Sequence, residues 1–152
     1  MTVPVVTRIL APVELDEHGR IEVAYAIGLA AQLRAELVFF AVIDTAATLG
    51  LVARHRVPDH GRADFEASLL REVEGLLQGA VDRAASAGVR ALGHARIHEA
   101  VEEQILKEAL VQKVDLILVR ASGRSGLMKG LLGSTAGEIL KAAPCPVLVA
   151  RT

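Results

Sequence analysis

One stretch of the sequence decides the fold: VDLILV at residues 114–119, followed directly by RASGRSGLMKGLLGST at residues 120–135. The first part is a continuous apolar run rich in β-branched residues, which is typical of a strand buried on both faces of a parallel sheet. The second part is rich in glycine and ends with Ser134 and Thr135, where the pattern predicts that a helix begins. A buried strand, a glycine-rich loop and a helix start in this order indicate an α/β fold.

The rest of the chain repeats the same alternation of apolar runs and helical patterns. Gly88 stands where a left-handed residue ends a long helix, and Gly93 is expected to weaken the strand that follows. Residues 44–62 contain two glycines, two histidines and a proline, and we expect a long excursion that includes a helical turn. The expected strands are 5–13, 36–43, 89–97, 114–119 and 147–151, and the expected helices are 21–34, 63–87, 99–112 and 134–142.

This βαβ pattern predicts a mostly parallel sheet with helices on both faces and right-handed crossovers. In open sheets of this kind, ligands bind outside the carboxyl ends of the strands, where the strand order reverses. Residues that directly follow strands are therefore the candidates for function.

The composition limits the function classes. The chain has 152 residues, which indicates one domain, and a net charge of −1 with 3% aromatic residues, which does not favour nucleic-acid binding. No apolar run approaches the roughly 20 residues of a membrane-spanning helix. Cys145 is the only cysteine, so no intrachain disulfide can form, and the pattern favours a reducing, cytoplasmic location.

The glycine-rich loop has two open interpretations. Its glycines would let successive backbone N–H groups surround a phosphate, with Ser134, Thr135, Arg124 and Lys129 adding hydroxyls and charge. Alternatively, the glycines only permit tight turns and Ser134 is an ordinary N-cap. The loop lacks both the G-x(4)-G-K-[ST] and the G-x-S-x-G spacing, so it is neither a P-loop nor a nucleophile elbow.

At this point the chain resembles the universal stress protein family over nearly its whole length. The resemblance implies a three-layer, Rossmann-like fold of the adenine nucleotide alpha-hydrolase type, with an open parallel five-stranded sheet in the order 3-2-1-4-5. It also implies a homodimer whose C-terminal strands, residues 147–151, pair with each other, and that strand is an apolar edge. The matching segments are ILAPV at 9–13, AVID at 41–44, VDLILV at 114–119, GRSGL at 123–127, LLGS at 131–134 and APCPVLV at 143–149.

The ATP-binding branch of this family carries the pattern G-x(2)-G-x(9)-G-[ST]. Gly123 and Gly133-Ser134 match its second half, but Arg120 stands where the first glycine belongs. Glu14 replaces the usual aspartate after the first strand, and Val42 matches the apolar position beside the adenine. The resemblance implies that an adenine nucleotide such as ATP, with magnesium only when it binds, contacts Pro12, Val13, Glu14, Val42, Arg120, Gly123, Arg124, Gly126, Gly133, Ser134 and Thr135.

Two functions follow from this resemblance. The first is a non-catalytic stress-response protein that acts through ligand occupancy or partner contact, with no catalytic residue. Arg120 would pair with Glu14 or fill the phosphate space, and would weaken nucleotide binding, or else it would contact the phosphate itself. The alternative is an ATP-binding protein with slow hydrolysis, for which Glu14 is the only base that we can place near the phosphates.

The remaining polar residues receive structural interpretations. We expect the five histidines, at 18, 55, 60, 94 and 98, to lie on the surface and to hold no metal. The acidic and basic residues of 99–108 read as a solvated helix face. Cys145 reads as a small packed residue and Asp115 as a structural one. The apolar residues of 44–62 would cover either the pocket or a dimer partner.

Overall fold

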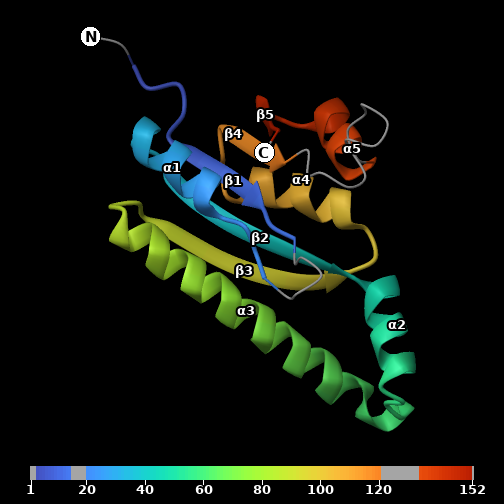
Figure 1. Ribbon diagram of the computed structural model, residues 1–152. Coiled ribbons are helices and arrows are strands. Elements are labelled where there is room, and N and C mark those ends of the chain that lie inside the picture. The colour runs from blue at the N-terminus through green and yellow to red at the C-terminus, as the bar shows by residue number, and fades with distance from the viewer. Residues whose placement is uncertain (1–2, 15–19, 121–133, 152) are drawn as a thin grey trace.

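The computed structural model describes residues 3–14, 20–120 and 134–151. The strands form one parallel five-stranded sheet in the order β3-β2-β1-β4-β5 (Figure 1), which confirms the predicted arrangement. In chain order, the elements are β1 (Arg8–Pro12), α1 (Ala24–Leu33), β2 (Glu36–Asp44), α2 (Thr45–Arg54), the 3-10 turn η1 (Asp59–Gly61), α3 (Arg62–Ser86), β3 (Ala91–His98), α4 (Val101–Val111), β4 (Leu116–Arg120), α5 (Ser134–Ala142) and β5 (Val147–Ala150).

Helices cover both faces of the sheet and divide the core into two apolar clusters (Figure 1). Successive side chains of a strand point to opposite faces, so β2 supplies both clusters. Leu37 and Phe39 pack with α1 and α3, whereas Val38 and Phe40 pack with α4 and α5. All four are at most 1% exposed, and each such side chain contributes roughly 1.5–3 kcal/mol relative to an exposed one. The continuous apolar run of β2 therefore exists because both of its faces are covered.

The prediction of an irregular excursion at residues 44–62 was wrong. The ten-residue helix α2 begins at once after β2, where Asp44 Oδ1 accepts a hydrogen bond of 2.9 Å from the Ala46 N–H. Gly50 lies inside this helix, so glycine there weakens the helix without ending it. Figure 1 shows α2 and the first turns of α3 projecting beyond the end of β3, and these two helices contact each other.

Four helices are followed by a residue in the left-handed conformation, and only one of these residues is glycine. Gly88 has a φ of 77° after α3, as predicted, while Arg34 after α1, Arg56 after α2 and Lys113 after α4 have φ values of 55°, 52° and 54°. A residue with a side chain costs roughly 1 kcal/mol in this region, so the sequence gives no signal of these three helix ends. At each of the four ends, the next residue donates its N–H back to the helix, as Val89 does to the Ala84 carbonyl at 2.8 Å.

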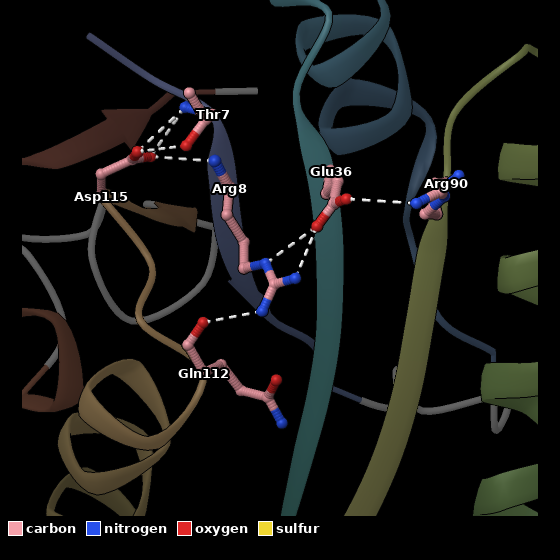
Figure 2. Close-up of polar contacts among 6 residues, drawn as sticks. All are labelled: Thr7, Arg8, Glu36, Arg90, Gln112 and Asp115. Atoms are coloured by element: carbon pink, nitrogen blue, oxygen red, sulfur yellow. Dashed lines mark hydrogen bonds and ion pairs between the residues drawn. The ribbon is translucent and has the colours of Figure 1, made fainter.

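Asp115 ties the start of β1 to the start of β4 (Figure 2). Its carboxylate accepts hydrogen bonds from the N–H and the hydroxyl of Thr7 and from the N–H of Arg8, at 2.7–3.0 Å. Burial tends to raise the pKa of Asp115, but the hydrogen bonds from Arg8 and Thr7 outweigh it and hold the pKa below its ordinary value. The predicted structural role of Asp115 is confirmed.

A chain of ion pairs extends from this junction across the amino ends of β1, β2 and β3 (Figure 2). Arg8 donates through Nε and Nη2 to Glu36 Oε2, at 3.0 and 2.6 Å, and through Nη1 to the Gln112 carbonyl at 2.9 Å. Arg90 approaches the other oxygen of Glu36 at 3.7 Å. These contacts lie at the amino edge of the sheet, opposite to the carboxyl edge where a ligand is expected to bind.

Candidate functional site

The residues after β1 lie at the carboxyl edge of the sheet. Pro12 ends β1 in register with Phe40, and the Val13 N–H donates to the Phe40 carbonyl at 2.9 Å. Val13 is 8% exposed and belongs to the core, whereas Glu14 is exposed. Of these three residues, Glu14 therefore presents its side chain to solvent at this edge.

Val42 lies near the end of β2, on the same edge of the sheet. It is half-buried, pairs in register with Arg96 of β3 and packs against the cluster under α4 and α5. Its position near the carboxyl end is compatible with an apolar contact to a planar ring.

Arg120 is the last residue of β4 and pairs with Ala150 of β5. β1 and β4 are neighbours, as predicted, and Leu10 is in register with Ile117. Counted forward from this pair, Arg120 lies beside Val13, one residue before Glu14. The backbone thus brings the two residues close, and the ion pair between their side chains stays a prediction.

The glycine-rich loop itself, with Gly123, Arg124, Gly126 and Gly133, lies outside the described residues. Ser134 and Thr135 are the first two residues of α5, and the predicted start of this helix is confirmed. Because β4 and β5 are parallel neighbours, α5 runs back along the sheet and begins near its carboxyl edge. The first N–H groups of a helix lack partners within it and attract anions.

The arrangement matches that of known proteins. The model of the universal stress protein family matches residues 6–151. The chain belongs to this family. It is 31% identical over 147 residues to the universal stress protein MJ0531 of Methanocaldococcus jannaschii, covering 95% of this chain and 81% of the relative. It is 33% identical over 131 residues to YxiE of Bacillus subtilis, covering 83% and 86%.

Solved structures, universal stress proteins among them, share the fold. The hypothetical protein MJ0577 superposes with a TM-score of 0.75 at 20% identity, with 97% of each chain covered. A universal stress protein in complex with cAMP has a TM-score of 0.63 at 19% identity and covers 97% of this chain and 98% of its own. The Arabidopsis thaliana family protein At3g01520, with AMP bound, has a TM-score of 0.64 at 15% identity, with 95% and 91% covered.

Two polar residues of this universal stress protein differ from their sequence-based interpretations. Glu108 was predicted on a solvated helix face, but it is 3% exposed and its Oε2 contacts Nε2 of His94. His94 was predicted as a surface histidine, but it is half-buried and lies against the Phe40 ring, with 4.9 Å between ring centroids. The spacing of charges along α4 gave no signal of this pair, because its partner lies on another element.

His98, at the end of β3, is half-buried and has a defined contact: its Nδ1 accepts the N–H of Ala100, at 2.9 Å. The prediction of a surface histidine did not foresee this contact. Within residues 3–14, 20–120 and 134–151, no three His, Cys, Asp or Glu side chains are grouped so as to hold a metal ion.

Cys145 is half-buried and packs against the cluster under α4 and α5, as predicted. Burial raises the pKa of its thiol above the ordinary value, and the negative charge of Asp115 raises it further. A raised pKa disfavours the thiolate, which is the nucleophilic form.

None of the helices in the described part of this universal stress protein is long and apolar enough to cross a membrane.

Proposed function

We propose that this chain is a non-catalytic, cytoplasmic stress-response protein that binds an adenine nucleotide at the carboxyl edge of its sheet. The observation that carries the proposal is the convergence of Val13, Val42 and Arg120 at this edge, where α5 begins. The bound cAMP and AMP of two structures with the same fold support this class of ligand. The chain would act through occupancy of this site and through contact with a protein partner.

Arg120 is the feature that we expect to weaken binding. It ends β4 at the position of the first motif glycine, next to the backbone of Val13 and close to Glu14. A glycine at this place would let phosphate oxygens approach the backbone, whereas a guanidinium side chain occupies that space. We therefore propose an affinity for ATP that is weaker than micromolar.

The substitution Arg120→Gly is expected to tighten the binding of ATP with magnesium about tenfold, which corresponds to roughly 1.4 kcal/mol. The physical reason is that the change frees the space at the end of β4 that the phosphates need. Isothermal titration of nucleotide-free protein measures both dissociation constants.

The matched control is Arg34→Gly, which removes an arginine at the opposite edge, where the φ of 55° suits glycine. This control is expected to leave the dissociation constant unchanged. A micromolar constant for the wild-type protein that Arg120→Gly does not alter would contradict the role of Arg120. Turnover of radiolabelled ATP by the same samples is expected to stay at the level of buffer, and product above that level would favour the hydrolytic alternative.

We also propose that two chains pair through β5. In support, β5 is an edge strand of the sheet, and its valines are only half-buried. The Pro146 carbonyl accepts a hydrogen bond from the Ile117 N–H. By the alternation of a strand, the backbone groups of Val147 and Val149 then face away from β4, where a second copy could accept and donate hydrogen bonds.

Light scattering after gel filtration is expected to give a mass of twice 16.1 kDa for the wild-type chain. The substitution Val149→Pro removes an N–H at the outer edge of β5 and is expected to shift the chain to a monomer. Ala91→Pro makes the same change at the start of β3, the other edge strand, and is expected to leave the mass unchanged. A Val149→Pro protein that is folded by circular dichroism and still dimeric would place the interface elsewhere.

A further inference from the structure

The crossover from β3 to α4 is fastened by two histidines of one strand. His94 and His98 lie four residues apart on β3, so they point to the same face of the sheet. His94 contacts Glu108 in the last half of α4, and His98 contacts Ala100 just before α4 begins. The first contact joins the last half of α4 to the edge strand, and the second holds the turn between β3 and the start of α4.

The first contact involves a buried carboxylate. The side chain of Glu108 is 4% exposed, and that of His94 is 32% exposed. Gln112 donates a further hydrogen bond to Glu108 Oε2 at 3.2 Å, and the Phe40 ring covers His94. A carboxylate out of water needs a compensating positive charge, and the imidazolium form of His94 supplies one.

The state of this first pair depends on its number of protons. With one ionisable proton on the pair, either as imidazolium and carboxylate or as neutral imidazole and carboxylic acid, the buried site has no net charge. When that proton leaves, His94 still donates an Nε2 hydrogen bond, but Glu108 stays behind as a buried anion with neutral donors only. The contact therefore weakens as the pH rises.

The second contact has the opposite dependence. Nδ1 of His98 accepts a hydrogen bond from the Ala100 N–H, so this nitrogen carries no proton. Protonation of His98 places a hydrogen on Nδ1, which removes the acceptor and sets two donors against each other. This contact therefore weakens as the pH falls.

We propose that the crossover from β3 to α4 is a proton-sensitive brace, held at both ends only between an acid and an alkaline limit. Histidine is the side chain that ordinarily changes charge between pH 5 and 8, and the tests of the two limits therefore span that range. The brace is built by His94 with Glu108 at one end and by His98 with Ala100 at the other.

Other charged groups lie on the elements around the brace and contribute to its local field. These groups are Arg96 of β3, Glu36 and Asp44 of β2, Glu102, Glu103 and Lys107 of α4, and Glu138 and Lys141 of α5. Asp44 is in register with His98, and Arg96 lies between the two histidines on the same face. The variants chosen below leave all of these groups in place, so their field stays constant across the comparison.

The brace adjoins the candidate nucleotide site. Val101, the first residue of α4, and Val42 of β2 pack against the same apolar cluster. A displacement of the first residues of α4 would therefore change the packing around Val42. This consequence for a ligand rests on the proposed function, whereas the brace itself does not.

The alkaline limit is tested with His94→Gln, Glu108→Gln and the double variant, by thermal unfolding at pH 6 and pH 9. The glutamine at 94 imitates the neutral imidazole, because it donates a hydrogen bond without charge. At pH 6 each single variant is expected to lower the unfolding midpoint by about 5 °C, with the double variant no lower than either. At pH 9 His94→Gln is expected to agree with the wild-type protein within about 2 °C, and Glu108→Gln is expected to be at least as stable as the wild type, because it removes the buried anion. Equal gaps at both pH values would overturn this half of the proposal.

His60→Gln is the matched control, since His60 is an exposed histidine of η1. Its midpoint is expected to follow that of the wild-type protein at both pH values. A control that reproduced the behaviour of His94→Gln would show a general effect of histidine charge and would overturn the assignment to the pair.

The acid limit is tested with His98→Asn, whose Oδ1 accepts the Ala100 N–H at every pH, and with His98→Ala, which has no acceptor. Hydrogen exchange of the Ala100 amide is the readout. In the wild-type protein, protection of this amide, corrected for intrinsic exchange, is expected to fall about tenfold from pH 7.5 to pH 5.5. It should remain constant in His98→Asn and be low at both pH values in His98→Ala. Unchanged protection in the wild-type protein would overturn this half.

The same variants separate the brace from the proposed function. If nucleotide binds, its dissociation constant is expected to change between pH 5.5 and pH 7.5 in the wild-type protein. The ratio of the two constants is expected to be about threefold smaller in His98→Asn. If no nucleotide binds at any pH, the proposed function fails, while the unfolding and exchange results still decide on the brace. A ratio that His98→Asn leaves unchanged would overturn the link between brace and site.

Discussion

Replacement of Asp115 by alanine is expected to lower the free energy of unfolding by about 3 kcal/mol at pH 7. The carboxylate accepts hydrogen bonds from Thr7 and Arg8, and its removal leaves their N–H groups without these acceptors. The same change separates the start of β1 from the start of β4, two neighbouring strands of the sheet. Urea denaturation followed by circular dichroism measures the difference.

The effect of Asp115 is expected to depend on pH in one direction. Its pKa is lowered in the folded chain, so the folded state favours the carboxylate, and the stabilisation is fully present above the pKa of an unfolded aspartate, about 3.9. It is lost as the pH falls through the lower pKa of the folded state. The gap between wild type and Asp115→Ala should therefore shrink below pH 4, while a gap that stayed constant from pH 7 to pH 3 would contradict the role of the charge.

Asp82→Ala is the control for this comparison. Asp82 is an exposed aspartate of α3 whose side chain accepts one hydrogen bond, at 3.0 Å, from Gln78. Its replacement is expected to change the free energy of unfolding by less than about 0.5 kcal/mol, because surface substitutions away from networks have small effects.

The sheet could be predicted from the sequence because its central strands are buried on both faces. The runs at β2 and β4 are apolar without interruption, and such runs are not solvated strands. The order of the strands followed from the family resemblance. The positions of Val13, Val42 and Arg120 at one edge then followed from parallel topology alone, since all strands end there.

What the sequence did not reveal depends on contacts between distant elements. α2 was missed because Gly50 weakens its intrinsic helix propensity, while contacts with β2 and α3 support the helix in the folded chain. Glu108 was misread because its neighbours along α4 are charged, and its partner His94 lies fourteen residues earlier on a strand. Spacing within one helix cannot show which of its polar residues turns inward to meet another element.

Gly93 gives the second large expected effect, and here the structure reverses the expectation from sequence. A glycine inside a strand weakens it, so a β-branched replacement would be expected to strengthen β3. However, a Cβ at position 93 would lie 3.2 Å from Cβ of Leu77 and 3.6 Å from Phe39. Leu77 is fully buried where α3 packs on β3, so it cannot move without displacing the helix.

Gly93→Val is therefore expected to lower the free energy of unfolding by about 3 kcal/mol, and Gly93→Ala by about 1 kcal/mol. Gly79→Ala, on the exposed side of α3 with nothing within 4 Å of an added Cβ, is expected to raise it by about 1 kcal/mol. Chemical denaturation of the three variants measures these opposite signs. A Gly93→Val protein as stable as the wild type would mean that α3 can shift away from β3 at little cost, because no other change makes room for two further methyl groups between Leu77 and Phe39.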